Sequence, residues 1–363
     1  MNATTKHIPF EASHPGSLLL DEIKFRNLNQ KELAKQMEIQ PSLFNEIIKG
    51  KRALTADIAI LLEKILEIPA DYWMRLQSQY EIDLARIKEK NIQKLANIES
   101  WGIIKNYVPT SYFRKNNYLK EDLTVDIKTI KSIYEVDSID MLVQKTVQQH
   151  FAYHRKSEKL KVDDKNMLAW NMLAKYEVKN QPVNSFNDSN IPSLIKELKE
   201  IFYENTNTIN RVKAKLNQYG IKFVLVAKIE KAPIDGYTFW SENNPAIAMT
   251  IRHKRIDNFA FTIMHELGHI DLHLKHDREK HFFDLSDKKG HSDDVEKEAD
   301  SYAQSNLIST NEWEDIIQLP VRDDHSIKVI SEKHKINPAI ILGRMSYEAA
   351  SYAINTSIDK TLK

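Results

Sequence analysis

The most informative stretch of the chain reads Phe261-Thr-Ile-Met-His-Glu-Leu-Gly-His-Ile270. Its apolar residues recur at helical spacing, which predicts a helix with one side packed against a core. On such a helix His265 and His269 lie one turn apart on the same side, so both imidazoles can reach one metal ion. Glu266 then points beside that ion, which makes it the predicted general base.

A second segment, Glu296-Lys-Glu-Ala-Asp300, offers the carboxylates that such a site needs. A zinc ion that keeps a position for water takes three protein ligands, and a carboxylate is a common third. Glu296 is the predicted third ligand. Asp300 lies one turn further on and is expected to accept the free ring N–H of a ligating histidine. Zn²⁺ is the expected cofactor, with Mn²⁺ as the alternative.

Other histidines compete for the third ligand position. His273 continues the series of His265 and His269, but eight residues of α-helix rise about 12 Å, too far for ligands of one zinc unless the helix breaks first. The weaker alternatives are His276, His281 and His291. The spacing selects no donor for an oxyanion, and the candidates are Tyr302, His325, His334 and Arg344.

Length and composition limit the class of protein. The chain has 363 residues with 8 Gly and no Cys, which favours helices and leaves His and carboxylates as the strong metal ligands. The start lacks the apolar core of a signal peptide, and no run approaches the roughly 18 apolar residues of a membrane helix, so a cytoplasmic protein without a membrane partner is expected. A net charge of +1 gives no argument for nucleic acid, so such an argument must come from local arrangement.

Two short helices with a tight turn are predicted near the N-terminus. Asn29-Gln-Lys-Glu32 is typical of a capping box that opens a helix, and a second helix is expected from Gln40 to Lys49. In a helix-turn-helix the second helix enters the major groove by its first residues, which assigns base contacts to Gln40 and Ser42. An ordinary helical bundle with a solvated face is the alternative. The predicted phosphate contacts are Gln30, Asn45, Lys49, Lys51 and Arg52.

Four motifs in this region resemble the XRE-type helix-turn-helix of HigA-family antitoxins. They are His14-Pro-Gly-Ser-Leu-Leu-Leu20, Asn29-Gln-Lys-Glu-Leu-Ala34, Lys49-Gly-Lys-Arg52 and Asp71-Tyr-Trp73, within roughly residues 7–90. The resemblance implies a lambda-repressor-like bundle, a dimer on a palindromic operator, autorepression and, in simple members, a partner toxin. The sequence departs from the family at Glu38, which replaces the usual Gly of the turn, and at Pro41 within the recognition helix.

The rest of the chain divides into two further regions. Residues 1–95 form the predicted helix-turn-helix domain, residues 96–165 a helical connector and residues 166–363 the metal-binding domain. Segments rich in β-branched and aromatic residues predict a small antiparallel sheet beside the metal helix, whose edge could hold an extended peptide. The expected fold is mainly α, with an α+β C-terminal domain. The predicted strands are residues 221–229, 236–240 and 245–252.

From about Leu168 onward the chain resembles ImmA/IrrE-type zinc metallopeptidases. The segments that carry this likeness are Pro233-Ile-Asp-Gly236, Asp257-Asn-Phe259, His265 to His269, Glu296 to Ala303 and Ile336 to Met345. The resemblance implies a zincin-like domain with His265, His269 and Glu296 as zinc ligands and Glu266 as general base. It also implies a role in stress responses or mobile elements, where such peptidases cleave a helix-turn-helix repressor.

Functions from different classes remain open. In the first, a DNA-binding transcriptional regulator carries a zinc endopeptidase that cleaves itself or a partner repressor or toxin to switch gene expression. In the second, a HigA-like antitoxin and autorepressor neutralises a toxin by binding, and its zinc domain is not catalytic. Both predict a double-stranded DNA operator, a protein partner and a homodimer. A peptidase without a DNA role would show no salt-dependent duplex binding.

Overall fold

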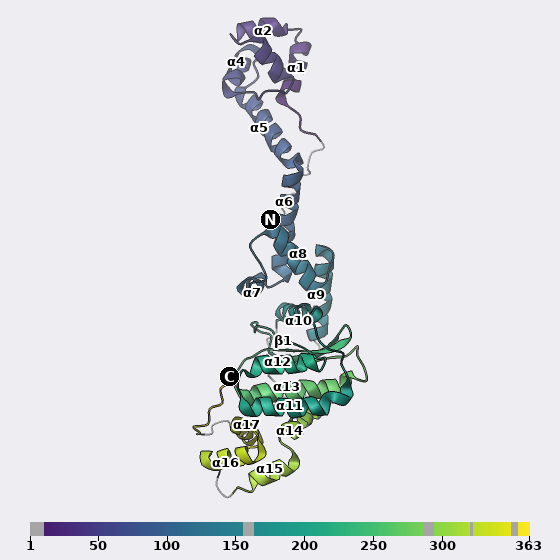
Figure 1. Ribbon diagram of the computed structural model, residues 1–363. Coiled ribbons are helices and arrows are strands. Elements are labelled where there is room, and N and C mark those ends of the chain that lie inside the picture. Colours follow the sequence, from purple (N-terminus) through teal and green to yellow (C-terminus); the bar gives the residue numbers. More distant parts are fainter. Residues whose placement is uncertain (1–10, 155–162, 286–293, 320–321, 350–354) are drawn as a thin grey trace. The chain divides into compact units, whose positions relative to one another are not determined.

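The computed structural model describes residues 11–154, 163–285, 294–319, 322–349 and 355–363 (Figure 1). The chain divides into two compact units, Met1–Trp101 and Gly102–Lys363. Both are mainly helical, and the second also contains a small sheet, so the predicted fold class is confirmed. The expected boundaries near residues 95 and 165 stay predictions. No helix in the described ranges combines the length and the hydropathy needed to cross a bilayer.

The first unit is a helical bundle around one apolar core. Its fully buried side chains include Leu19, Phe44, Ile47, Leu62 and Trp73. They come from successive helices, each of which buries one apolar side, as a bundle requires. The helices are α1 (Pro15–Phe25), α2 (Gln30–Gln36), α3 (Pro41–Ile48), α4 (Ala56–Leu66) and α5 (Ala70–Ile87), followed by α6 (Glu89–Tyr107), which continues into the second unit.

The turn between α2 and α3 explains both departures from the HigA pattern. The side chain of Asn29 accepts the backbone N–H groups of Lys31 and Glu32, which is one half of the predicted capping box. Glu38 has φ of 54°, a left-handed conformation that costs a non-glycine residue about 1–2 kcal/mol, so the usual Gly has a physical reason. Pro41 is the first residue of α3, where its missing N–H breaks no helical bond.

Gly16→Ala is expected to destabilise the first unit, although Ala is the better helix former. A Cβ at Gly16 would collide with the carbonyl oxygens of Ile47 and Ile48, so α1 could no longer approach the end of α3. Overpacking of this kind costs about 1–3 kcal/mol, more than the 0.5–1 kcal/mol or so gained from helix propensity. Thermal or urea unfolding of the variant measures the difference.

Gly102→Ala is the matched control, because Gly102 also lies in a helix, α6, and a Cβ there would meet nothing within 4 Å. This variant is expected to be as stable as the parent or slightly more stable. Equal effects of the two substitutions would contradict the close packing of α1 on α3.

The second unit contains a four-stranded mixed sheet. Its strands β1 (Lys222–Leu225), β2 (Ile234–Ser241), β3 (Asn244–Met249) and β4 (His281–Leu285) lie in the order β1-β3-β2-β4. The helices of this unit include α7 (Thr110–Lys115), α8 (Leu123–Tyr134), α9 (Ile139–His154), α10 (Asp164–Lys179), α11 (Ile191–Glu204), α12 (Thr208–Gln218), α13 (Ile256–Gly268), α14 (Asp294–Leu307), α15 (Thr310–Ile317), α16 (Asp324–His334) and α17 (Pro338–Glu348), with the short turns η1 (Asp188–Asn190) and η2 (His269–Leu274).

The prediction of an antiparallel sheet is wrong for β1, and β4 was not predicted. β2 pairs antiparallel with both β3 and β4, so β1 adds to the remaining edge of β3 and runs parallel to it. Alternating side chains reveal a strand but not the direction of its neighbour, because direction depends on which edges are already paired. β4 is only five residues long and includes His281 and Asp284, which weakens its apolar pattern.

Helices cover the two faces of the sheet. Trp170 of α10 meets Tyr237 of β2 edge-on on one face. The next residue of β2, Thr238, points to the opposite face and contacts Glu266 of α13. Helices α11, α12 and α13 run side by side in the same unit (Figure 1). The sheet therefore places β2 and β4 directly against the helix that carries His265 and Glu266.

Candidate metal centre and helix-turn-helix surface

The predicted ligand His265 lies near the end of α13, and His269 begins the π-helical turn η2 that continues it. Ile263, Met264 and Leu267 of α13 are fully buried in the core, so the helix is anchored on its apolar side. Both histidines have no solvent-exposed surface, and their Nε2 atoms lie 3.0 Å apart. Two imidazoles are thus turned toward a common point inside the protein.

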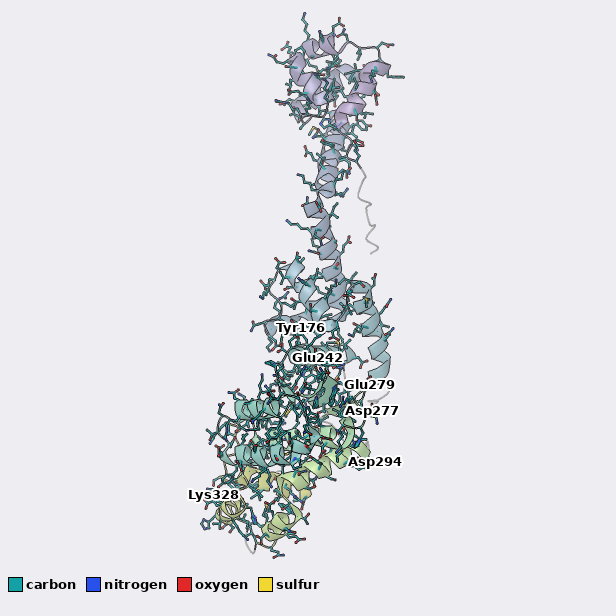
Figure 2. The ribbon with its side chains drawn as sticks, turned by 45° about the vertical axis from the view of Figure 1, so that its right-hand side comes forward. Tyr176, Glu242, Asp277, Glu279, Asp294 and Lys328 are labelled. Carbon is teal, nitrogen blue, oxygen red and sulfur yellow. The ribbon has the colours of Figure 1, made fainter. Side chains whose placement is uncertain are left out.

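The third predicted ligand, Glu296, lies in the first turn of α14. The helix can be found in Figure 2 by its exposed first residue, Asp294. The carboxylate oxygens of Glu296 lie 3.4 Å from Nε2 of His265 and 3.4 Å from Nε2 of His269. One ligand atom from each residue lies within 4.8 Å of the other two. Donor atoms of a tetrahedral zinc site are about 3.3 Å apart, so this nitrogen and carboxylate set could hold such an ion.

Asp300 lies against the ring nitrogen of His265 that faces away from His269 and Glu296. Its Oδ1 lies 2.8 Å from Nδ1 of His265, which fixes the proton on that nitrogen and leaves Nε2 for the centre. Burial tends to lower the pKa of His265, but hydrogen bonds to Asp300 and Glu296 outweigh it and raise the pKa to about 10, so an ion that binds Nε2 must displace the proton from that nitrogen. Burial tends to raise the pKa of Glu296, yet its hydrogen bonds with the two histidines hold that pKa far below its usual range.

The Glu266 carboxylate is fully buried against β2 and β4. The hydroxyl of Thr238 donates to its Oε2, and Oε1 lies over Gly236, where any Cβ would collide with it. Ligand atoms of Glu266, Asp284 and His265 also lie within 4.8 Å of one another. Burial raises the pKa of Glu266 to about 8. A carboxyl group with such a pKa can both accept and return a proton near neutral pH.

Three residues at this site were missed by reasoning from the sequence. Gly236 was noted only as part of a motif, and Thr238 and Asp284 were not singled out. Asp284 is buried although it is charged, and an acid inside the run His281-Phe-Phe-Asp-Leu285 is the one signal that could have pointed to it. The roles of Gly236 and Thr238 depend on strand pairing, which no local pattern reveals.

Among the residues that the structure describes, no competing histidine lies in the cluster of His265, His269 and Glu296. His273 lies beside His269, with ring centroids 5.6 Å apart, and its Nε2 is 3.8 Å from Glu298. His276 is exposed on the turn after η2, and His281 packs beside Tyr237 on the other face of the sheet. His291 lies outside the described residues.

The candidate oxyanion donors are engaged elsewhere or exposed. The hydroxyl of Tyr302 donates to Asp271, and Nε2 of His334 pairs with Asp315. The Arg344 guanidinium donates to the Ile308 carbonyl and lies over the Trp313 ring. His325 is exposed on α16. These contacts support a structural role for Tyr302, His334 and Arg344.

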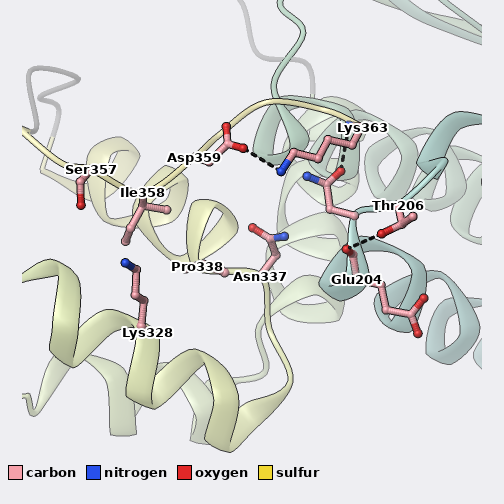
Figure 3. A pocket seen from close by; sticks show the side chains of 10 residues that line it. Glu204, Thr206, Lys328, Asn337, Pro338, Ser357, Ile358, Asp359 and Lys363 are labelled. Atoms are coloured by element: carbon pink, nitrogen blue, oxygen red, sulfur yellow. Dashed lines mark hydrogen bonds and ion pairs between the residues drawn. The ribbon is translucent and has the colours of Figure 1, made fainter.

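A separate cavity of about 390 Å³ lies between the end of α11, α16, the start of α17 and the C-terminal segment. Lys328 extends from α16 toward Ile358 (Figure 3). The two buried amides on its wall are already bonded within the protein, Asn205 to the Thr361 carbonyl and Asn337 to the Phe202 carbonyl. The cavity therefore offers few unused polar groups to a ligand.

The predicted DNA contacts lie around α3. Gln40 precedes the helix as its N-cap residue and Ser42 lies in its first turn, and both are exposed. Lys49, Lys51 and Arg52 at the other end are exposed as well, although Arg52 pairs with Glu46 at 3.2 Å. The predicted contacts that are only partly exposed are Gln30 and Asn45.

The comparisons with known proteins concern this first unit. The family described as helix-turn-helix matches residues 26–73. Virulence-associated protein I of Dichelobacter nodosus is 34% identical over 82 residues, which cover 22% of this chain and 76% of that protein. The chain belongs to the helix-turn-helix family. A second relative of this helix-turn-helix protein is the uncharacterized HTH-type transcriptional regulator YddM of Escherichia coli. It is 32% identical over 73 residues, which cover 20% of this chain and 78% of that protein.

Solved structures of HigA antitoxins are similar to the same segment. The HigA-family addiction module antidote protein of Coxiella burnetii is 33% identical, covering 23% of this chain and 95% of that chain, with a TM-score of 0.22. Antitoxin HigA of Pseudomonas aeruginosa, solved with the higBA promoter, is 32% identical. The match covers 21% of this chain and 83% of that chain, with a TM-score of 0.20. The predicted helix-turn-helix is confirmed, and the first unit is a DNA-binding module of this type.

Proposed function

We propose that this helix-turn-helix protein is a DNA-binding regulator whose second unit is a zinc-dependent endopeptidase of the ImmA/IrrE type. The observation that carries the proposal is the convergence of His265, His269 and Glu296 around one buried point, with the Glu266 carboxylate beside it. A site that only stabilised the fold would need no buried carboxylate next to its ligands. Mn²⁺ suits the same nitrogen and oxygen donors less well than Zn²⁺.

The proposed reaction is hydrolysis of one peptide bond. A zinc ion held by His265, His269 and Glu296 would act as a Lewis acid, lowering the pKa of water toward about 7 and polarising a carbonyl group. Glu266 takes a proton from the attacking water while the water oxygen bonds to the carbonyl carbon. As the C–N bond breaks, Glu266 gives that proton to the leaving amine. Asp300 keeps the His265 imidazole in the tautomer that the site requires.

The proposed substrate is a protein that controls transcription. Because both units share one chain, it is this protein's own helix-turn-helix, a second copy, or a separate repressor or toxin. Cleavage would remove a DNA-binding or toxic segment and so switch gene expression. Full-length protein loaded with zinc, incubated alone and with proteins encoded beside it, should yield one discrete pair of fragments by mass spectrometry. Failure to cleave any of these would count against the peptidase.

Binding of a double-stranded operator is proposed to depend on two classes of residue. Lys51→Ala should weaken binding to all duplexes alike and reduce the slope of log K against log salt by about 1, because one phosphate contact is lost. Gln40→Ala should instead relax the preference at one base pair by about 1–3 kcal/mol. Fluorescence anisotropy with a duplex selected from a random pool measures both effects.

Lys64→Ala is the control for these variants, because Lys64 is an exposed lysine of α4 outside the predicted contact set. It should bind like the parent at every salt concentration. An equal loss in Lys51→Ala and Lys64→Ala would mean that only bulk charge matters and that α3 does not face the groove.

The second candidate function is that of an antitoxin and autorepressor that neutralises a toxin by contact, with a zinc domain that is not catalytic. The similarity of the first unit to HigA antitoxins favours it. Under this alternative the fragments described above never form, and the protein still binds both operator and toxin. A homodimer is proposed under both functions, and sedimentation analysis tests it.

A further inference from the structure

The two histidines of the centre are oriented in different ways. Nδ1 of His265 is held by Asp300 at 2.8 Å. Nδ1 of His269 is buried and has no hydrogen-bond partner among the described residues. A metal-ligating histidine is usually fixed by a hydrogen bond from its second ring nitrogen. His269 must therefore take its orientation from another contact.

The ring that lies flat against the His269 imidazole is that of Phe282. The rings of Phe282 and His269 are parallel to within 3°, with centroids 4.6 Å apart. Phe282 lies on β4 opposite Thr238 of β2, so strand pairing turns it toward α13 and η2. The next residue, Phe283, points to the other face and stacks on Tyr237 with centroids 4.1 Å apart.

The main chain does not by itself fix the ring of His269. This residue opens the π-helical turn, and its N–H is directed at the carbonyl oxygens of both Glu266 and His265. These bonds set the position of its Cα, but the second side-chain torsion of a histidine has a broad, shallow energy profile. A flat neighbour that covers one face of the ring restricts this rotation.

We propose that Phe282 is the positioning residue of His269 and keeps its Nε2 directed at Nε2 of His265 and at Glu296. The ligand is then ordered before the metal arrives, so binding does not have to supply that order. This inference rests on the proposed metal centre but not on its peptidase activity.

Phe282→Leu should bind zinc roughly tenfold more weakly than the parent, since contacts that orient a ligand are worth about 10- to 100-fold in affinity. The affinity is measured on the full-length protein by competition with a chromophoric chelator. The visible absorption of the Co²⁺-loaded variant should also shift, because one imidazole is no longer held at a fixed angle. Phe282→Tyr keeps the ring and should restore both properties.

Phe283→Leu is the matched control from the opposite face of the same strand. It can lower the melting temperature, but its zinc affinity and Co²⁺ spectrum should equal those of the parent. Parent-like affinity in Phe282→Leu, or the same weakening in Phe283→Leu, would overturn the role of Phe282. If the parent itself binds no zinc, the proposed centre and this inference both fail.

Discussion

Glu266→Gln is expected to reduce peptide cleavage by about 10²- to 10⁴-fold, the range that general acid–base catalysis contributes. Glutamine has nearly the same shape and its amide oxygen can still accept the Thr238 hydroxyl, but it cannot take a proton from water. The rate of fragment formation, followed by quantitative mass spectrometry, measures the loss. Persistent cleavage in this variant would rule out Glu266 as the base.

The same variant should bind zinc within a few-fold of the parent, because Glu266 is not in the ligand set with His269 and Glu296. Loss of cleavage with retained zinc separates a chemical role from a structural one. Glu298→Gln is the matched control, since the Glu298 side chain lies on α14 and is 61% exposed. It should cleave at the rate of the parent.

The sequence predicts which side chains converge where these residues lie close together along a helix. The spacing of His265 and His269, and of Glu296 and Asp300, converts directly into positions on one side of a helix, and the structure brings all four together. The helices α2 and α3 could also be predicted from the sequence, because helix capping and the spacing of apolar residues are local properties.

The surroundings of the centre could not be predicted, because they depend on contacts between distant segments. Gly236 and Glu266 are 30 residues apart, and their contact exists only because β2 packs on α13. Phe282 reaches His269 only through the pairing of β4 with β2. The π-helical turn at His269 also has no local signature, although it lies where the helix leaves the ligand cluster.

Glu296→Ala is expected to lower zinc affinity by at least about a hundredfold. Removing a residue that only hydrogen-bonds to a metal ligand already weakens metal affinity about 10- to 100-fold. Glu296 is itself the proposed third ligand, so its loss should weaken affinity more. Its removal also leaves the buried imidazoles of His265 and His269 facing each other without their carboxylate. His265→Ala should have a similar effect. Equilibrium dialysis followed by metal analysis measures the occupancy.

Zinc should also raise the melting temperature of the parent, because an ion that binds only the folded protein stabilises it by RT ln(1 + [Zn²⁺]/Kd). This increase should vanish in Glu296→Ala. Glu298→Ala removes a carboxylate two residues further along α14, whose contact with His273 is 3.8 Å, and should keep both occupancy and the thermal shift. Parent-like occupancy in Glu296→Ala and His265→Ala would mean that the ion binds elsewhere, and the hydrolytic role of the second unit would lose its basis.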